Sequence, residues 1–356
     1  MKKKTLTLLL LILFISIMRY DNTIAKASPS LSKKSLTLSA GTMSHITIKN
    51  ASSFSYMKWS SSDKDIAKVD SKTGYVTGIN KGSCKIYLKY RIGKSKKTHT
   101  LTCKITVKKK PIFYQFQTLA HALGGLEDKY VYSNSKEAFY SNYQLGQRFF
   151  EVDLTLSSDS KVVCTHGWKK KDYTFTGIQY SKDKPMLSYD DFMGSKVQSK
   201  YTTIDVSTIA EFIKNYPDSY FVFDLKPSSN LDAMNTTLQI LEAFNNDKSL
   251  LSHVMMQVNS INAYKGVTSV YKFTYMQYLA DKNDIDKLSN IITFCKKNHL
   301  SSISMEDKYI TKSRIRSIKM KGLYLSTYTV DNVKNAKKLL SMGVDVVCSN
   351  FIIDLN

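Results

Sequence analysis

The first pattern of apolar and polar residues along the chain predicts a small all-β domain. Between residues 31 and 108, short β-prone runs alternate with stretches rich in Ser, Gly, Asn and Lys, which favour turns. Runs at this spacing are typical of a two-sheet, Ig-like sandwich of about 80 residues. The expected strands are 35–38, 45–49, 55–60, 66–70, 75–79, 84–90 and 100–107.

The second pattern, from residue 112 onward, alternates strands with helices. About eight strand-then-helix units in about 245 residues predict a closed α/β TIM (β/α)8 barrel. An open doubly wound sheet is the alternative, but no Gly-rich nucleotide fingerprint follows the first expected strand. The expected strands are 113–120, 148–156, 161–165, 220–225, 254–258, 272–276, 301–305, 323–328 and 344–348, and the expected helices are 135–145, 208–215, 231–245, 284–298, 311–320 and 331–342.

The first 27 residues have the pattern of a secretory signal peptide. Lys2-Lys3-Lys4 forms a basic start, residues 6–18 are apolar, and Ala25-Lys26-Ala27 fits a cleavage site. The apolar run of 13 residues is too short to span a bilayer comfortably. The alternative is a retained signal anchor. We expect a secreted, extracellular protein, with association with the cell wall as an option.

Charge is concentrated in one segment and marks a domain boundary. The chain has a formal net charge of +23, and residues 28–110 carry 18 basic and 3 acidic residues, or +15 of it. We therefore divide the chain into a signal peptide (1–27), a sandwich (28–110) and a barrel (111–356). The basic sandwich is either a solvated lysine coat or a surface that attracts polyanions, such as an anionic membrane or wall teichoic acid. Nucleic acid is disfavoured as a partner, because aromatic residues do not interleave with the lysines.

The positions of the cysteines allow one disulfide. An exported protein can hold disulfides, and Cys84 and Cys103 lie on expected neighbouring strands, so they could pair. No C-x-x-C spacing occurs among the five cysteines, so a cysteine-rich zinc site is not indicated.

Ionisable residues gather where the expected barrel strands end, which is where a barrel has its active site. The first strand ends at His121, and a later extended run ends at His166. The strand 148–156 places Glu151 and Asp153 on one face, because strand side chains alternate. Another strand ends in an Asp-Leu-Lys run, at Asp224 and Lys226.

The residue types in this cluster favour phosphodiester chemistry. The three carboxylates, Glu151, Asp153 and Asp224, are hard oxygen ligands suited to Mg²⁺ or Ca²⁺. Two imidazoles, at His121 and His166, can share the acid and base roles, and Lys226 can pair with a phosphate oxygen. Each feature alone also fits a solvated strand face or a packed histidine, so the prediction rests on their convergence.

Motifs in the sandwich resemble the bacterial Ig-like domain of group 2. Such domains in secreted bacterial proteins serve as spacers or adhesion modules, so no catalytic role is expected here. The matching runs are Lys58-Trp59-Ser60-Ser61-Ser62-Asp63, Ile66-Ala67-Lys68-Val69-Asp70, Gly74-Tyr75-Val76-Thr77-Gly78 and Lys81-Gly82.

Motifs in the barrel resemble the glycerophosphodiester phosphodiesterase family of the PLC-like phosphodiesterase superfamily. The resemblance implies catalytic His121 and His166 and a divalent metal at the three carboxylates. Its substrate would be a glycerophosphodiester, a phospholipid headgroup or a teichoic acid, held by Lys226, Trp168 and Tyr328. The matching runs are His121-Ala122-Leu123-Gly124-Gly125, Asn134-Ser135-Lys136-Glu137-Ala138-Phe139, Phe150-Glu151-Val152-Asp153-Leu154, Val163-Cys164-Thr165-His166, Tyr328-Thr329-Val330-Asp331 and Gly343-Val344-Asp345-Val346-Val347.

Four positions depart from the family pattern. Ala122 replaces the arginine after the first histidine, Ser133 replaces the acid before Asn134, Gly167 replaces the acid after the second histidine, and Asp224 stands where a Glu is common. The Asp-x-Lys form also resembles the sphingomyelinase D-type phospholipases of the same superfamily. Two other functions remain as alternatives: a non-catalytic surface adhesin or polyanion-binding protein with a degenerate barrel, and a glycosidase, which would use two carboxylates without a metal.

Overall fold

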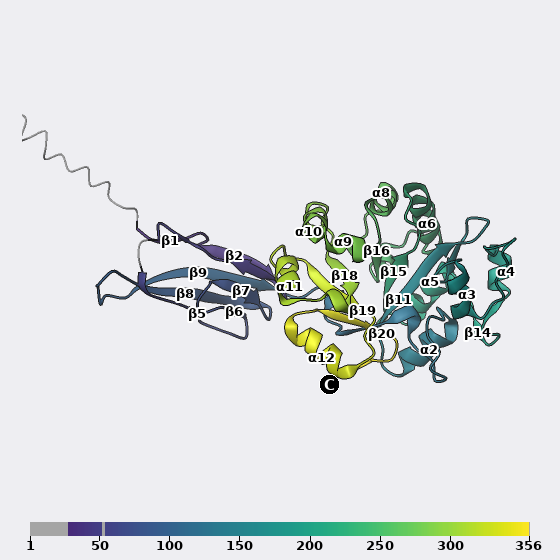
Figure 1. The fold of residues 1–356 in the computed structure, drawn as a ribbon, viewed down its shortest axis with the longest axis horizontal. Coiled ribbons are helices and arrows are strands. Elements are labelled where there is room, and N and C mark those ends of the chain that lie inside the picture. Colours follow the sequence, from purple (N-terminus) through teal and green to yellow (C-terminus); the bar gives the residue numbers. More distant parts are fainter. Residues whose placement is uncertain (1–27, 52–53, 356) are drawn as a thin grey trace, which may run out of the picture.

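The computed structural model describes residues 28–51 and 54–355, so the expected signal peptide lies outside the described residues. Two domains lie end to end, with the sandwich at one end of the long axis and the barrel at the other (Figure 1). Among the described helices, none is long and apolar enough to cross a membrane.

The N-terminal domain has the expected sandwich architecture. Its strands alternate inward apolar and outward polar residues, and the inward set, including Trp59, Ile86 and Leu88, forms a separate core. One sheet has the order β2 (Ser35–Ser39), β9 (His99–Lys108), β8 (Gly82–Ile92), β5 (Phe54–Ser61); the other has β3 (Met43–His45), β7 (Tyr75–Gly78), β6 (Ala67–Val69); and β1 (Ser30–Leu31) pairs with β4 (Ile48–Lys49).

The two sandwich cysteines do not form a disulfide. Cys84 lies opposite Ile105 and Cys103 lies opposite Ile86 on the adjacent strands β8 and β9. Both thiols are buried and free, as are the other three cysteines. Burial raises the pKa of the Cys84 and Cys103 thiols, so both act as small apolar side chains in the core.

The C-terminal domain is the expected closed barrel. Eight parallel strands follow one another, and pairing of Ala120 with Phe150 closes the ring between the first and second strands. The strands are β10 (Thr118–Ala120), β11 (Phe149–Leu156), β15 (Tyr220–Leu225), β16 (Val254–Val258), β17 (Tyr275–Ala280), β18 (Ser302–Glu306), β19 (Tyr324–Tyr328) and β20 (Val346–Ser349).

Helices surround this ring in the order expected of alternating units (Figure 1). Most begin at a Ser, Thr, Asp or Asn whose side chain accepts a backbone N–H bond, as at Ser135 and Asp205. They are α2 (Lys136–Gln144), α3 (Lys170–Thr176), α4 (Tyr189–Met193), α5 (Val206–Asn215), α6 (Asn230–Ala243), α7 (Lys248–Leu251), α8 (Ile261–Val270), α9 (Lys282–Ile285), α10 (Leu288–Lys297), α11 (Lys312–Lys319) and α12 (Val333–Met342).

Several expected elements differ in detail. The run 113–120 is a 3₁₀ turn, η1 (Ile112–Tyr114), followed by the short β10, because Phe113 and Tyr114 pack into a separate aromatic cluster with Phe149 instead of continuing a strand. The run 161–165 contains β12 (Val162–Cys164), which pairs antiparallel with β11 outside the ring. The helix expected over 284–298 is divided into α9 and α10, and α8 was not expected.

The sandwich contacts the amino-terminal end of the barrel strands. The hydroxyl of Tyr324, the first residue of β19, donates to the carbonyl of Ala40 at 3.2 Å. Asp345, just before β20, pairs with Lys110 at 3.0 Å and also with the buried Lys319. The sandwich is therefore at the opposite end of the barrel from the strand ends that carry His121 and Asp224.

Candidate active site

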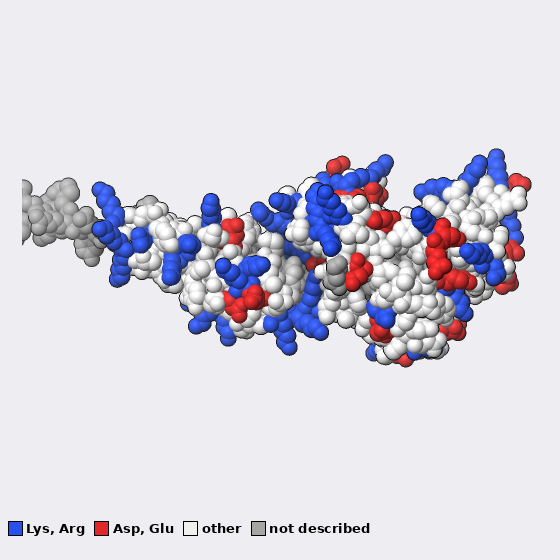
Figure 2. Space-filling model, turned by 90° about the horizontal axis from the view of Figure 1, so that it is seen from below, with Lys and Arg blue, Asp and Glu red and all other residues white. Residues whose placement is uncertain are grey.

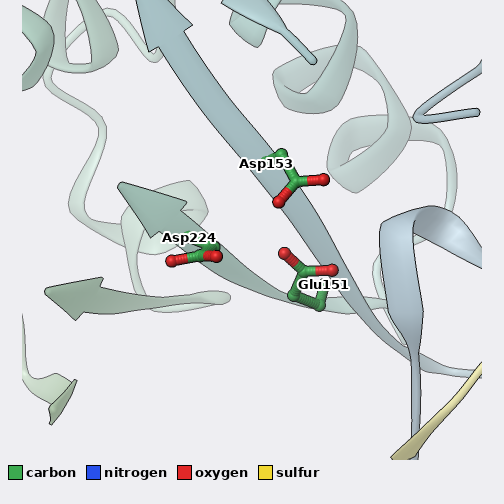
Figure 3. Close-up of side chains that lie close together, drawn as sticks. All are labelled: Glu151, Asp153 and Asp224. Atoms are coloured by element: carbon green, nitrogen blue, oxygen red, sulfur yellow. The ribbon is translucent and has the colours of Figure 1, made fainter. Parts of the chain in front are cut away.

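Three carboxylates converge from two adjacent barrel strands. Glu151 and Asp153 project from β11 and Asp224 from β15, and Asp153 lies directly opposite Asp224 in the sheet register. Each offers one oxygen, and these oxygens lie within 4.8 Å of one another. Figure 3 shows the three side chains directed toward a common space. All three are buried, so their charges are poorly screened by water.

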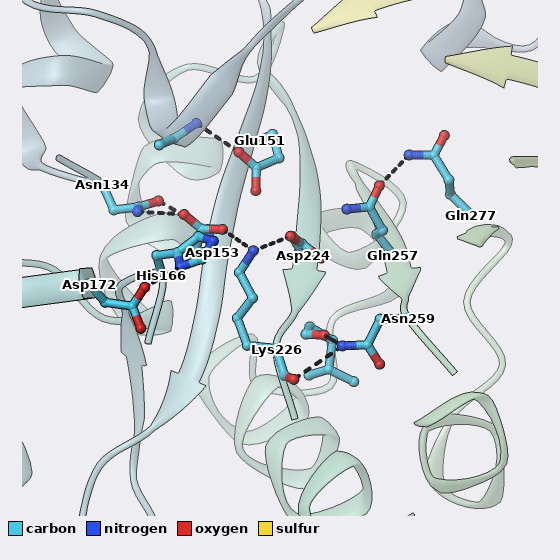
Figure 4. A network of polar contacts seen from close by, with 12 residues as sticks. Asn134, Glu151, Asp153, His166, Asp172, Asp224, Lys226, Gln257, Asn259 and Gln277 are labelled. Carbon is cyan, nitrogen blue, oxygen red and sulfur yellow. Dashed lines mark hydrogen bonds and ion pairs between the residues drawn. The ribbon is translucent and has the colours of Figure 1, made fainter. Parts of the chain in front are cut away.

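Three residues hold this cluster in place. Lys226 pairs with Asp153 at 2.5 Å and also with Asp224, so its ammonium lies between the two carboxylates (Figure 4). Asn134 binds Asp153 from the other side. Its side-chain nitrogen donates to the Asp153 carboxylate at 2.8 Å, and its side-chain oxygen accepts the backbone N–H of Asp153 at 3.0 Å. Glu151 is fixed by the backbone N–H of Ala122 at 2.7 Å.

The charged groups of the cluster shift one another's pKa values. Burial, with the neighbouring Asp153 and Asp224 carboxylates, raises the pKa of Glu151 well above its usual value. Burial also opposes ionisation of Asp153, but the Lys226 ammonium and the two imidazoles outweigh it and hold the pKa of Asp153 low. Burial likewise disfavours the charged Lys226, yet the carboxylates raise its pKa well above normal. The cluster therefore attracts positive charge beyond that of the single lysine.

This arrangement fits a divalent metal. The buried Oδ1 of Asp224 is among the few described side-chain atoms without a hydrogen-bond partner, which is costly unless something binds it. Three carboxylate oxygens around one space are the donor set that hard cations prefer. Glu151, Asp153 and Asp224 would hold the ion.

His121 follows β10 in the short turn η2 (His121–Leu123) and is oriented by a relay of side chains. Its Nδ1 lies 3.0 Å from Oδ1 of Asn350, whose amide nitrogen donates to Asp331 at 2.8 Å. Because Asp331 fixes the amide, Oδ1 of Asn350 accepts from Nδ1–H and leaves Nε2 of His121 as the proton acceptor. Burial lowers the pKa of His121 from 6.5, although the nearby Asp153 carboxylate favours the charged imidazole and partly opposes this shift.

His166 follows β12 and is oriented by a carboxylate. Its Nδ1 lies 2.9 Å from Oδ1 of the buried Asp172 at the start of α3. The second oxygen of Asp172 accepts the backbone N–H of Lys169 at 2.8 Å. The carboxylate has only acceptors to offer, so Nδ1 carries the proton and Nε2 is free for chemistry.

Both histidines line one pocket of about 210 Å³, together with Glu151, Asp224, Lys226 and Tyr328. Tyr132 lies between the imidazoles, with ring centroids 4.4 Å from His121 and 5.8 Å from His166. Trp168 does not line this pocket. It lines a neighbouring groove, where its indole N–H donates to the carbonyl of Leu156 at 2.6 Å.

The loop carrying His121 has an uncommon backbone. Ala122 and Leu123, neither of them glycine, adopt positive φ values of 48° and 69°. Such conformations are unfavourable for residues with a Cβ and are found where surrounding contacts impose them. Here the turn positions the Ala122 N–H to donate to Glu151, and it places His121 in the wall of the pocket.

A belt of polar side chains lies in the barrel beside the carboxylates (Figure 4). Gln277 donates to Gln257 at 2.6 Å and accepts from Ser302 and Ser326 at 2.8 and 2.9 Å. All four are buried. Gln257 lines the pocket, so this belt presents an ordered polar wall to a ligand there.

The sequence prediction missed several of these residues. Asp172, Asn350, Asp331 and Tyr132 were not named as site residues. Asn350 directly follows the last barrel strand. Active-site residues lie at the carboxyl ends of barrel strands, so the reasoning that identified Asp224 could also have identified Asn350. Asp172 carried no such signal, because it sits on a helix after the histidine it orients.

Comparisons with known proteins agree with this geometry. The model of the glycerophosphoryl diester phosphodiesterase family matches residues 125–354, and that of the bacterial Ig-like domain, group 2, matches residues 26–101. A search of curated proteins gives no match.

Solved structures share the barrel fold. The structure of an Oleispira antarctica phosphodiesterase in complex with the product sn-glycerol-3-phosphate aligns with a TM-score of 0.55 at 16% identity, over 68% of this chain and 97% of that one. A glycerophosphodiester phosphodiesterase from Parabacteroides distasonis aligns with a TM-score of 0.52 at 15% identity, over 66% of this chain and 92% of that one.

The fold and site together define a phosphodiesterase built on a (β/α)8 barrel. The family model covers most of the chain, and the protein belongs to the glycerophosphoryl diester phosphodiesterase family. The predicted family and fold are thereby confirmed, and the glycosidase and the non-catalytic adhesin no longer apply.

Proposed function

We propose that the protein is an exported, metal-dependent enzyme that hydrolyses glycerophosphodiesters or the headgroup phosphodiesters of phospholipids or teichoic acid. The observation that carries this proposal is the single pocket bordered by both oriented histidines, two of the three clustered carboxylates and Lys226. Family membership supports the reaction type. The run Asp224-Leu225-Lys226 also resembles phospholipases of the same superfamily, so more than one leaving alcohol fits the proposal.

We propose Mg²⁺ or Ca²⁺ as the metal, held by Glu151, Asp153 and Asp224. All three ligands are carboxylates, and no cysteine or histidine belongs to the described cluster, which favours a hard cation over zinc. When bound, the ion neutralises charge on the phosphate oxygens.

The two histidines are suited to opposite proton transfers. His121 is neutral at pH 7 because its pKa is lowered, so its Nε2 takes the proton of the substrate glycerol hydroxyl that attacks phosphorus. His166 enters this step with both ring nitrogens protonated, its Nδ1–H on Asp172, and it gives its Nε2 proton to the leaving oxygen as the bond from phosphorus to that alcohol breaks. The products of this step are a cyclic phosphate and the free alcohol.

Hydrolysis of the cyclic phosphate restores both histidines. His166, now neutral, takes a proton from the attacking water, and His121 returns its proton to the glycerol oxygen that leaves. The balance is one diester and one water consumed, and one glycerol phosphate and one alcohol formed. Glycerol 3-phosphate is the product named for the Oleispira enzyme, which supports a glycerol phosphate product here.

The direct test is an assay of the purified full chain against glycerophosphodiesters, lysophospholipids and teichoic acid, with and without divalent metal. We expect release of a glycerol phosphate and a free alcohol only when metal is present. Failure to cleave any phosphodiester in the presence of Mg²⁺ and of Ca²⁺ contradicts the proposal.

We further propose that the sandwich draws the enzyme to an anionic surface. Its outer sheet face sets lysines directly opposite each other across strands, Lys58 with Lys89 and Lys85 with Lys104. Like charges in such positions destabilise a sheet, and in the described part of 28–110 only Lys110 forms an ion pair. Figure 2 shows Lys and Arg side chains over the sandwich end of the molecule, with few acidic ones. A polyanion would relieve this repulsion.

A further inference from the structure

A second cavity adjoins the catalytic pocket. We call it the lysine groove: a space of about 490 Å³ whose walls include Ser157, Ser158, Trp168, Lys169, Lys171 and Met186. It shares two lining residues, His166 and Lys226, with the catalytic pocket. A substrate whose phosphate lies at these two residues therefore extends directly into the groove.

The shared histidine identifies which half of the substrate enters the groove. In the proposed function, on which this inference rests, His166 protonates the oxygen of the leaving alcohol. That alcohol must then lie on the side of His166, and the groove is the space there. The catalytic pocket, at about 210 Å³, is left for the phosphate and the glycerol that carries the attacking hydroxyl.

The groove carries unpaired positive charge. Lys169 and Lys171 are exposed and form no ion pair with any described residue. Asp172 is already engaged by His166 and the Lys169 backbone. The other acid at the groove, Asp232, accepts a hydrogen bond from Ser229. Two lysines without an ion pair among the described residues and one available carboxylate thus line the groove, and this balance of charge favours an anionic ligand.

One wall of the groove is rigid. The Trp168 indole is fixed by its bond to the Leu156 carbonyl at 2.6 Å and by an edge contact with the buried Phe192, at 5.8 Å between centroids. A fixed apolar wall in a groove that exposed lysines also line provides a channel for a chain that continues past the scissile bond.

We propose that the lysine groove binds a leaving group that carries a further phosphate, as in an oligomeric polyol phosphate. It discriminates against leaving groups that bear an ammonium, such as choline, because Lys169 and Lys171 repel them. The enzyme is therefore selective for anionic chains over cationic headgroups.

The test compares two glycerophosphodiesters with the full-length protein. A glycerol phosphate oligomer with a phosphate beyond the scissile bond is set against glycerophosphocholine, for the wild type and for the double variant Lys169→Gln/Lys171→Gln. We expect the wild type to prefer the oligomer. The variant should lose about three- to tenfold in kcat/KM on the oligomer, mainly through KM, and gain on glycerophosphocholine.

The control is Lys337→Gln/Lys338→Gln, a lysine pair on α12 that is also exposed and does not line the groove. It should leave both kcat/KM values unchanged. Added salt should reduce the wild-type preference, because the attraction is screened.

Three outcomes overturn the inference: a wild-type preference for glycerophosphocholine, an equal loss on both substrates in the groove variant, or faster cleavage of phosphatidylglycerol in vesicles than of the oligomer. If the wild type cleaves glycerophosphocholine well and the oligomer not at all, the groove assignment fails while the proposed function stands. If it cleaves no phosphodiester, the proposed function itself fails.

Discussion

Asp172 accepts a hydrogen bond from Nδ1 of His166 at 2.9 Å and is itself almost fully buried. The family pattern places an acid directly after this histidine, where the chain has Gly167. Asp172 thus supplies from the start of α3 a carboxylate that the neighbouring position lacks. Gly167 has φ 157°, and a Cβ there would lie 2.9 Å from Oδ2 of Asp172, so the glycine makes room for this carboxylate.

The first prediction concerns this positioning role. Asp172→Asn should lower kcat by about ten- to a hundredfold with little change in KM, because the imidazole loses its fixed orientation but stays in place. The pH profile of kcat should also change, which a purely structural role would not produce. Asp191→Asn on the exposed face of α4 is the control and should be neutral. Unchanged kcat in Asp172→Asn would mean that the pair has no part in positioning His166.

The second prediction concerns the histidines themselves. His121→Ala and His166→Ala should each lower kcat by about 10²–10⁴-fold, the usual contribution of a general acid or base. Thermal unfolding should shift little, because both residues lie at strand ends rather than in the main core. A variant with near-normal kcat would remove that histidine from the proposed mechanism.

The third prediction follows from the lowered pKa of His121. Burial disfavours its charged form, so the base stays neutral to a lower pH than free imidazole, whose pKa is 6.5. Activity that needs neutral His121 is present above the lowered pKa and is lost as pH falls through it. The acidic limb of kcat/KM should therefore have its midpoint below 6.5. A midpoint above that value would contradict the assignment of His121 as the base.

The fourth prediction concerns the basic sandwich. Replacing Lys58, Lys85, Lys89 and Lys104 by Gln should weaken binding of the full chain to teichoic-acid-bearing walls, and added salt should weaken wild-type binding steeply. Activity on a small soluble diester should be unchanged, because the sandwich lies at the opposite end of the barrel from the site. The measurement is cosedimentation, with anionic vesicles as a second surface. Absence of wild-type binding to either surface at low salt would reduce the domain to a spacer.

The sequence predicted the parts of the molecule that depend on local pattern. Alternation and turn residues located the sandwich strands, and the carboxylates expected on the barrel strands located the acidic cluster of Glu151, Asp153 and Asp224. The motif around Asp345 was less informative, because this acid lies at the amino-terminal end of β20 and pairs with Lys110 and Lys319 at the domain contact. Nothing local distinguishes it from the acids at the other end of the barrel.

The residues that sequence reasoning missed depend on closure of the ring. Asn350 reaches His121 only because β20 pairs with β10, which brings together residues 229 positions apart. Tyr132 lies between the histidines because its loop has positive φ at Tyr132 and Asn134. A periodic pattern of apolar residues does not predict such a loop. Long-range pairing and irregular backbone, rather than propensity, complete the site.

The central claim is that the three carboxylates hold a metal on which phosphodiester cleavage depends. The most direct measurement is the rate of glycerol phosphate release from a glycerophosphodiester by the wild type and by Asp153→Asn, each in excess chelator and after metal is restored, with Asp247→Asn at the start of α7 as the control. We predict that chelator abolishes wild-type turnover, that Mg²⁺ or Ca²⁺ restores it, and that Asp153→Asn needs about ten- to a hundredfold more metal and turns over more slowly. Full turnover in excess chelator, or in Asp153→Asn without added metal, would contradict the claim.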